Sequence, residues 1–204
     1  MKTLMIIMFL MLSTTAFADC PKTTIISFLL DETGSMDAQR DETITSVNQY
    51  IKKLQTEYSD VKFTLTKFNS ERIVTLYKNQ DVCSVSNLSR ETYVPNSTTP
   101  LYDAIMETIQ TIEKQIACQK DTRILFVILT DGLENSSCKY TQTDVFNKIK
   151  EKNLWQFVYL GVHPDAWHQN VTLGILNSFS TSTVGTSTSI YQLNNMTDTF
   201  MQTK

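Results

Sequence analysis

Two patterns of hydrophobic positions alternate along the chain. Continuous apolar runs rich in β-branched and aromatic residues predict strands. They lie at residues 23–30, 61–68, 72–77, 123–130 and 155–162. Between them, apolar residues recur at steps of three and four, which predicts helices with one apolar face. These patterns cover residues 44–58, 101–116, 145–149 and 190–200. Strands that alternate with helices indicate an α/β fold, with a doubly wound, mostly parallel central sheet flanked by helices.

Details of the pattern refine this sheet. The runs IISFLL (25–30) and ILFVILT (124–130) are apolar without alternation, which is typical of central strands that are covered on both faces. Only residues 69–71 separate the second and third predicted strands, so we predict a hairpin and one antiparallel edge strand. The serine- and threonine-rich stretch 180–189 is predicted to be a polar loop.

The first residues have the layout of a cleavable secretory signal peptide. Residues 1–18 combine Lys2, a short apolar core and small residues at Ala16 and Ala18. The apolar core is shorter than the roughly 20 residues of a membrane span, although an uncleaved N-terminal anchor is the alternative. We therefore expect an exported protein, periplasmic or extracellular, with residues 19–204 forming one domain that has no stable membrane insertion after cleavage.

The net charge and the distribution of basic residues limit the classes of binding partner that we expect. The formal net charge is −3, and the 18 Lys and Arg residues are scattered along the chain rather than clustered. Proteins that bind nucleic acids or anionic membranes usually carry a basic patch or stripe. We therefore expect no nucleic-acid partner and no partner on an anionic membrane.

Four cysteines remain after the predicted cleavage: Cys20, Cys83, Cys118 and Cys138. An even number in an exported chain predicts two disulfides, for which three pairings are possible. Cys20 opens the first predicted strand and Cys118 precedes a neighbouring one, which places both at the same end of the sheet. We therefore expect Cys20 to pair with Cys118 and, by exclusion, Cys83 with Cys138.

Two acids directly follow predicted central strands. Asp31 follows ISFLL and Asp131 follows LFVILT. In an open parallel sheet, ligands bind beyond the carboxyl ends of the strands, so neighbouring strands would bring these carboxylates to one crevice. The polar segment NSTTPLYDAI (96–105) opens the helix predicted to begin at Leu101, and it would bring Thr99 to the same edge.

Five side chains at this edge carry oxygen and suit a hard divalent cation. They are Asp31, Thr33, Ser35, Thr99 and Asp131. Mg²⁺ prefers about six oxygen ligands in octahedral geometry and usually keeps some water. Gly34 allows the hydroxyls of Thr33 and Ser35 to point to the same side as Asp31. The alternative is that these two hydroxyls only cap the helix that follows.

Three motifs in this order resemble the von Willebrand factor type A domain. They are DETGSM (31–36), TPLYDAI (99–105) and LTDG (129–132). The family's first motif is D-x-S-x-S, and its three motifs form a metal-ion-dependent adhesion site. The resemblance covers essentially all of residues 19–204, and FVYLGVHPDA (157–166) is similar to the family's bacterial members.

The resemblance implies a Rossmann-like binding domain rather than an enzyme. Asp31, Thr33 and Ser35 match the first motif, with threonine in place of the usual serine. Thr99 matches the family's threonine, with Thr98 as the alternative, and Asp131 matches the final acid. The resemblance further implies Mg²⁺ or Mn²⁺ at this site, and a protein partner that supplies an acidic side chain to the ion. A purely structural metal is the second possibility within this class.

An enzymatic alternative starts from the same first motif. DETGS also resembles the D-x-T-G-T motif of haloacid-dehalogenase-like phosphotransferases, in which Asp31 would be the nucleophile and Mg²⁺ would bridge the phosphate to Asp131. Asn135 stands where such enzymes carry a further acid, no obvious catalytic lysine precedes the last strand, and TTPLYDAI has no role. We therefore favour the binding domain.

Overall fold

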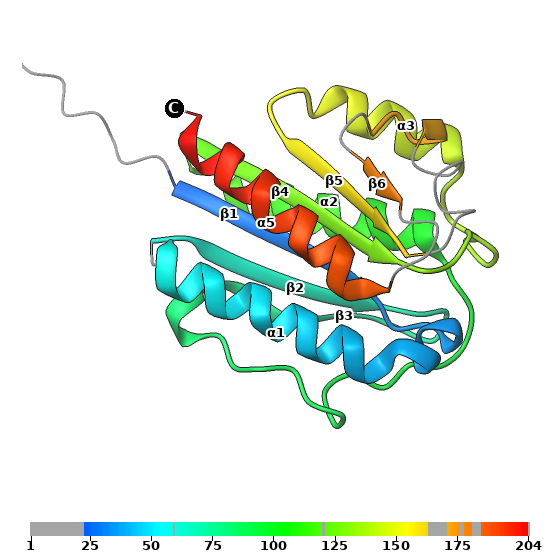
Figure 1. The fold of residues 1–204 in the computed structure, drawn as a ribbon. Coiled ribbons are helices and arrows are strands. Elements are labelled where there is room, and N and C mark those ends of the chain that lie inside the picture. The colour runs from blue at the N-terminus through cyan, green and yellow to red at the C-terminus, as the bar shows by residue number, and fades with distance from the viewer. Residues whose placement is uncertain are drawn as a thin grey trace, which may run out of the picture.

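The computed structural model describes residues 23–58, 60–119, 121–162, 171–175, 178–180 and 185–203, with only the backbone for 178–180. The predicted signal peptide (1–18) and Cys20 lie outside these residues, so the signal peptide stays a prediction. The strands form one sheet in the order β3-β2-β1-β4-β5-β6 (Figure 1). Their bounds are β1 Thr23–Asp31, β2 Lys62–Phe68, β3 Ile73–Asp81, β4 Thr122–Thr130, β5 Gln156–Gly161 and β6 Ser178–Ser180.

The sheet is parallel except at one edge, as predicted. β3 pairs antiparallel with β2, and the other neighbouring strands pair in parallel. β1 lies directly beside β4, with Leu30 opposite Leu129. Because the two strands run in register and in the same direction, Asp31 and Asp131 leave the sheet side by side at its carboxyl end.

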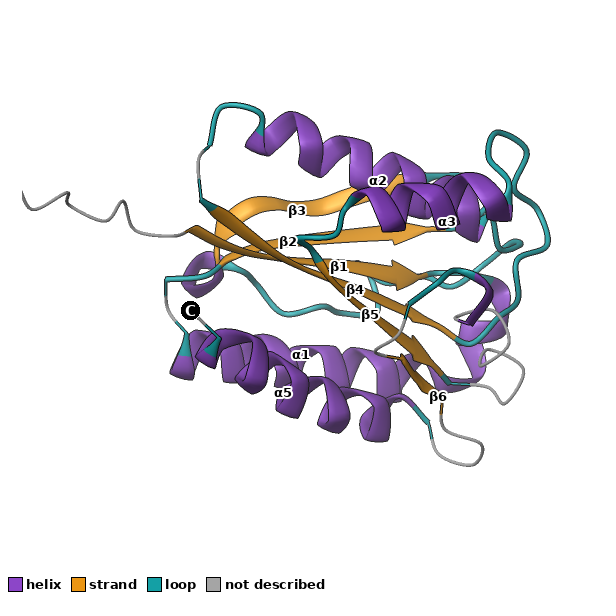
Figure 2. Ribbon diagram, turned by 90° about the horizontal axis from the view of Figure 1, so that it is seen from above, coloured by secondary structure: helices purple, strands orange, loops and turns teal. Residues whose placement is uncertain are grey.

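Helices cover both faces of the sheet. The α-helices are α1 Arg40–Glu57, α2 Leu101–Ile116, α3 Gln142–Glu151 and α5 Thr186–Gln202, and the short 3-10 helices are η1 Gly34–Gln39 and η2 Val82–Ser84. α2 and α3 lie on one face, and α1 and α5 lie on the other (Figure 2). Helices on both faces confirm the predicted doubly wound α/β fold.

Two hydrophobic cores, one on each face of the sheet, explain why the central strands are mostly apolar. In β1, Ile26, Phe28 and Leu30 pack toward α1 and α5, whereas Ile25 and Leu29 pack toward α2. Successive side chains of a strand point to opposite faces, so a strand covered on both faces is apolar at most positions, and Ser27 is the buried polar exception between Ile25 and Leu30. Among the described residues, no helix has both the length and the apolar character needed to cross a membrane.

The C-terminal part differs from the sequence prediction. β6 was not predicted, and α5 begins at Thr186, inside the stretch 180–189 that was predicted to be a loop. The carboxylate of Glu42 in α1 accepts hydrogen bonds from the amide and hydroxyl of Ser187. This tertiary contact satisfies donors in the first turn of α5, which explains a helix start that local sequence disfavours.

The predicted disulfide between Cys83 and Cys138 is not formed, and Cys20, the predicted partner of Cys118, lies outside the described residues. Cys118 and Cys138 are exposed, and each carries a free thiol. Because β3 runs antiparallel to β2, Cys83 follows it at the amino end of the sheet, whereas Cys138 lies near the start of α2 at the carboxyl end. A disulfide needs Cα atoms within about 7 Å, far less than the length of these strands.

Candidate metal centre

Asp31 and Asp131 meet the first hydroxyl motif at the carboxyl end of the sheet. The amide of Thr33 donates to the Asp31 carboxylate at 2.7 Å. The hydroxyl of Ser35 donates to Asp131 at 2.6 Å and lies 3.2 Å from the hydroxyl of Thr33. Four of the five predicted residues are thus connected through contacts between two neighbouring strand ends.

The hydroxyls of the first motif do not act as helix caps. Thr33 is the residue before η1, yet its side chain makes no capping hydrogen bond to that helix. Its hydroxyl contacts Ser35 instead, and the hydroxyl of Ser35 contacts Asp131. The capping alternative therefore does not explain their positions.

Thr99 completes the set and is distinguished from Thr98. The side chain of Thr99 is buried, and an atom added at the Cα of Gly132 would lie 3.3 Å from its hydroxyl and 3.7 Å from that of Ser35. Glycine at position 132 therefore lets the loop after β4 approach both hydroxyls closely. Thr98 is exposed, and its amide and carbonyl contact Ser70 instead.

The loop after β4 is fastened to the start of α2. The carbonyl of Thr99 accepts from the amide of Asn135 at 3.1 Å, and the amide of Thr99 donates to the Asn135 side chain at 2.8 Å. Glu134 accepts from the amide of Tyr102, and Ser137 accepts from that of Asp103. Donors in the first turn of α2 are thereby satisfied from another segment, which fixes Thr99 relative to Asp131.

Asp31 has an unusual electrostatic environment. Its side chain is fully buried, and it accepts hydrogen bonds from the amide of Thr33 and the hydroxyl of Thr130. Burial raises the pKa of the Asp31 carboxyl to about 7, the two hydrogen-bond partners oppose this rise, and the charge of Asp131 adds to it. No cation forms an ion pair with Asp31 within the part of the chain that the structure describes. A positive charge at this site would therefore favour its ionised form.

Comparisons with known proteins decide the family. The family profile of the von Willebrand factor type A domain matches residues 26–202. The chain belongs to the von Willebrand factor type A (VWA) family. A comparison with curated protein sequences gave no match.

Solved structures similar to this VWA domain include a manganese-loaded TRAP protein from Plasmodium vivax, with a TM-score of 0.61 and 18% identity over 85% of this chain and 73% of that one. The pilus adhesin SpaC from Lactobacillus rhamnosus GG, in an open conformation, has a TM-score of 0.63 and 14% identity over 87% of this chain and 30% of that one. Proximal thread matrix protein 1 from the mussel byssus has a TM-score of 0.53 and 13% identity over 87% and 44%. At these identities, the likeness establishes the fold.

The oxygen positions of this VWA domain fit a small divalent cation. In an octahedron with bonds of about 2.1 Å, neighbouring ligand oxygens lie about 3 Å apart. The distances from the Ser35 hydroxyl to Asp131 and Thr33, 2.6 and 3.2 Å, fall on either side of that value. Across the described segments, no three Asp, Glu, His or Cys side chains gather to hold a metal ion. The candidate set at the carboxyl end of the sheet instead combines two carboxylates with three hydroxyls.

The sequence prediction missed residues that support the site from behind. Thr130 donates to Asp31, and the side chain of Gln39 donates to Asp131 at 3.3 Å. Glu32, inside the first motif, is fully buried and accepts from Lys67 at 2.6 Å. A buried acid inside a motif requires a partner, but the sequence does not indicate which cation provides it.

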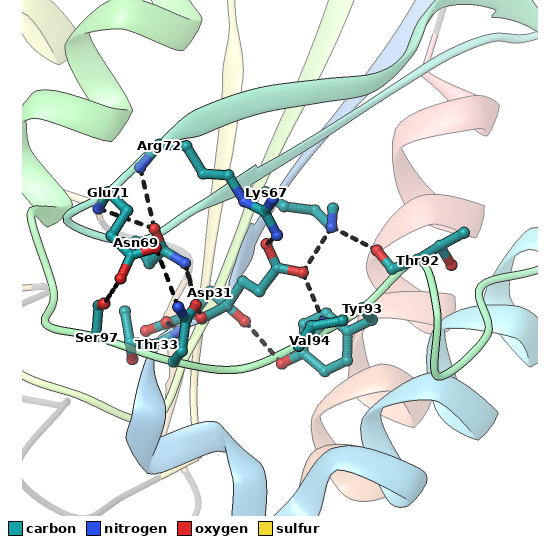
Figure 3. A network of polar contacts seen from close by, with 12 residues as sticks. Asp31, Thr33, Lys67, Asn69, Glu71, Arg72, Thr92, Tyr93, Val94 and Ser97 are labelled. Atoms are coloured by element: carbon teal, nitrogen blue, oxygen red, sulfur yellow. Dashed lines mark hydrogen bonds and ion pairs between the residues drawn. The ribbon is translucent and has the colours of Figure 1, made fainter.

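Figure 3 shows the polar contacts near the end of β1, with Lys67, Arg72 and Val94 around one carboxylate. The carboxylate belongs to Glu32. It accepts from the amide of Val94 at 2.7 Å and from the guanidinium of Arg72 at 3.3 Å. The hydroxyl of Tyr93 donates to the carbonyl of Asp31 at 2.7 Å. The segment that leads to Thr99 is thus joined to the end of β1 by side chains.

Proposed function

We propose that this VWA domain holds Mg²⁺ or Mn²⁺ at the carboxyl end of its sheet and uses it to capture a protein partner. The metal ligands, direct or through water, are Asp31, Thr33, Ser35, Thr99 and Asp131. The observation that carries the proposal is the convergence of oxygen atoms from two strand ends and the start of α2, with the hydroxyl of Ser35 between Thr33 and Asp131. The manganese-loaded TRAP structure and the SpaC pilus adhesin support it as similar folds.

Each residue has a distinct part in the proposed mechanism. The bound ion supplies a positive centre that attracts a carboxylate from the partner. Asp31 is buried and both of its oxygens accept hydrogen bonds, so it acts through water. Ser35 is exposed and Asp131 is partly exposed, so they hold the ion nearer to the surface. With three neutral hydroxyls and two carboxylates, the ion keeps enough affinity for an additional acidic ligand.

The surface around the site suits a protein partner. Leu133 follows Gly132 directly and has 47% of its surface exposed. Its neighbours Glu134 and Asn135 are held by the hydrogen bonds to the start of α2 and to Thr99. A partner whose acidic side chain reaches the metal would therefore find an apolar side chain on a well-held loop beside it. We propose that the protein is exported and acts in the periplasm or outside the cell.

The phosphotransferase alternative gains no support. The VWA family profile covers residues 26–202, and the carboxylate that would attack phosphorus is fully buried with both oxygens engaged. A nucleophile needs an oxygen that is free to approach its substrate. We therefore infer a binding domain without catalytic turnover. Hydrolysis of generic phosphoesters that disappears in Asp31→Asn would overturn this inference.

Metal titration tests the proposal directly. The full chain, stripped with EDTA and dialysed, is titrated with Mn²⁺ by calorimetry. We expect binding in the wild type, its loss in Asp131→Ala, and a decrease of about tenfold or more in Thr99→Ala. Thr98→Ala is the matched control, because residue 98 is exposed and its backbone contacts Ser70. Equal affinity in Thr99→Ala and Thr98→Ala would exclude Thr99 as a ligand.

Partner capture is tested separately from metal binding. Immobilised protein is incubated with proteins of the native envelope or culture fluid, with Mn²⁺ or with EDTA, and captured proteins are identified by mass spectrometry. We expect a captured protein that is lost with EDTA and in Asp131→Ala. Capture that is unchanged by both treatments, in a protein that binds Mn²⁺, would indicate a structural metal and a partner that docks elsewhere.

A further inference from the structure

The segment 92–99 has a peculiar attachment to the sheet. It carries Thr99 to the candidate site but contains no helix or strand. Lys67 at the end of β2 donates to the carbonyl of Thr92, and Glu32 at the end of β1 accepts from the amide of Val94. The two charged side chains also contact each other at 2.6 Å. The side chains of this ion pair thus provide backbone hydrogen-bond partners that a neighbouring strand would otherwise provide.

Further contacts continue this attachment toward Thr99. The amide of Asn96 donates to the carbonyl of Glu32 at 3.0 Å, and the amide of Gly34 donates to the carbonyl of Ser97 at 3.0 Å. Ser97 has a positive φ of 64°, a conformation that costs energy for a residue with a side chain. The segment therefore follows one defined path beside the first motif, and that path ends at Thr99.

The charge and the burial of Glu32 and Lys67 fix the position of the segment along the sheet. The side chain of Glu32 is fully buried and that of Lys67 is 6% exposed. A buried carboxylate is stable only when its donors are all in place, and charge-assisted hydrogen bonds are short and strongly oriented. An apolar contact would hold the segment against the sheet but would allow it to slide. Glu32 and Lys67 specify where residues 92 and 94 must lie.

We propose that Glu32, Lys67 and Tyr93 are positioning residues of the metal site, which fix Thr99 relative to Asp31 by holding segment 92–99 against the ends of β1 and β2. Tyr93 contributes through its hydroxyl, which donates to the carbonyl of Asp31 itself. This inference rests on the proposed metal site. It extends that site by residues that do not touch the ion.

Two double variants separate positioning from stability. Glu32→Leu/Lys67→Met replaces the ion pair with apolar side chains, an exchange that is often neutral for stability but removes the contacts to residues 92 and 94. Glu32→Gln/Lys67→Met also lacks the ion pair but keeps an oxygen that can accept from the amide of Val94. Lys62→Met/Asp81→Leu is the control, because this ion pair joins β2 to β3 at the opposite end of the sheet.

The readouts are Mn²⁺ affinity by calorimetry, thermal midpoint, and hydrogen exchange of residues 92–97 by mass spectrometry. We expect the Leu/Met variant to bind Mn²⁺ about tenfold or more weakly, as for other residues that orient metal ligands, and to exchange faster in 92–97. The Gln/Met variant should recover part of the affinity, because it keeps the contact to Val94 but not the one to Thr92, and the control should match the wild type. A folded Leu/Met variant that binds within twofold of the wild type would overturn the proposal.

A further substitution shows whether the effect passes through Thr99. Thr99→Ala should weaken Mn²⁺ binding in the wild type but add little in the Leu/Met background, because the threonine is already displaced there. Full additivity would overturn the proposal. If the Leu/Met variant does not fold, Tyr93→Phe takes its place, with a loss of a few-fold expected and an unchanged dissociation constant counting against it.

Failure of the proposed function would be visible in the wild type alone. A wild type that binds no Mn²⁺ refutes the metal site. In that case the exchange of residues 92–97 still decides whether the ion pair holds the segment. Faster exchange in Leu/Met than in the wild type and in the Lys62→Met/Asp81→Leu control supports the holding role, and equal exchange in all three refutes it.

Discussion

Two neighbouring acids at the end of β1 occupy opposite electrostatic environments. Asp31 and Glu32 are both fully buried. Glu32 is met by Lys67 at 2.6 Å, with Arg72 at 3.3 Å on its other oxygen. Among the described residues, Asp31 is met only by neutral donors, the amide of Thr33 and the hydroxyl of Thr130. The negative charge of Glu32 is therefore paired with cations, whereas that of Asp31 has no cationic partner in the part of the chain that the structure describes.

This difference indicates which acid serves structure and which serves binding. A buried carboxylate without a counter-charge is unfavourable, and proteins retain such groups mainly where a ligand or reaction needs them. Burial raises the pKa of Asp31 to about 7 for this reason. In the proposed metal site, a divalent cation would supply the missing positive charge beside Asp31. The chain itself supplies it on the Glu32 side.

The largest expected effect on stability comes from removing Lys67, the closest cation to Glu32. Lys67→Met should lower the free energy of unfolding by about 3–5 kcal/mol, because Glu32 keeps its charge in a buried place and loses its closest cation. Urea denaturation followed by circular dichroism measures the change. Lys62→Met is the control, since its partner Asp81 is exposed, and it should cost less than about 1 kcal/mol. Equal losses in both variants would contradict the assigned role of Lys67.

The next largest effect is the pH dependence of stability that Asp31 causes. The folded-state pKa of Asp31 is raised from its ordinary value of 3.8 to about 7. Its contribution to stability is therefore fully present below about pH 4 and is lost as pH rises through about 7. In EDTA, the wild type should lose up to a few kcal/mol relative to Asp31→Asn between pH 4 and pH 8.

Adding Mg²⁺ or Mn²⁺ should remove this loss in the wild type at pH 8 and have little effect in Asp31→Asn. Thermal midpoints at pH 4, 5, 6, 7 and 8, with and without metal, measure both changes. A pH dependence that is identical in the wild type and in Asp31→Asn would show that Asp31 is not the group responsible.

A smaller effect is expected from the hydrogen bond that eases the burial of Asp31. Thr130→Val removes the hydroxyl that donates to this carboxylate and accepts from the amide of Gly132. The pKa of Asp31 should rise further, Mn²⁺ binding at pH 7 should weaken several-fold, and stability should fall by about 1 kcal/mol. Calorimetric titration tests this, with Thr130→Ser as the variant that restores the hydroxyl. A Thr130→Ser protein as weak as Thr130→Val would point to packing instead.

The smallest effect is expected at Arg72. Its guanidinium lies 3.3 Å from Glu32, and 49% of its side chain is exposed. Arg72→Gln should therefore cost less than about 1 kcal/mol and leave Mn²⁺ affinity within twofold of the wild type. Urea denaturation and calorimetry measure the two quantities. A loss as large as that in Lys67→Met would make Arg72 the principal partner of Glu32.

The sequence was sufficient for much of the fold because local patterns encode it. The predicted helix 101–116 matches α2 in both bounds, since Pro100 stands directly before its first residue and an apolar face runs through it. The start of α5 was missed because it depends on Glu42, which is distant in sequence. The prediction of a Cys83–Cys138 disulfide failed because pairing by exclusion ignored the end of the sheet to which the predicted hairpin returns Cys83.

The candidate site was predictable to a similar extent. Its five residues stand in short motifs directly after strands or before a helix, so their positions follow from the order of the elements. The positions of the residues that support Asp31 and Glu32 do not follow from that order. Lys67 is 35 positions from Glu32, and Thr130 is 99 positions from Asp31. Nothing in either local sequence indicates which side chain the folded chain places opposite the other.

The same separations in sequence affect the stage of folding at which the candidate site forms. Ser35 meets Asp131 across 96 positions, and Tyr93 meets Asp31 across 62. Contacts between distant residues form late in folding because the chain must first close long loops, whereas α1 and α2 can form from local contacts. The carboxylates and hydroxyls of the site are therefore scattered over an unfinished chain. If the proposed metal site exists, its capacity to hold an ion would require the assembled sheet, and metal binding would report that the domain is folded.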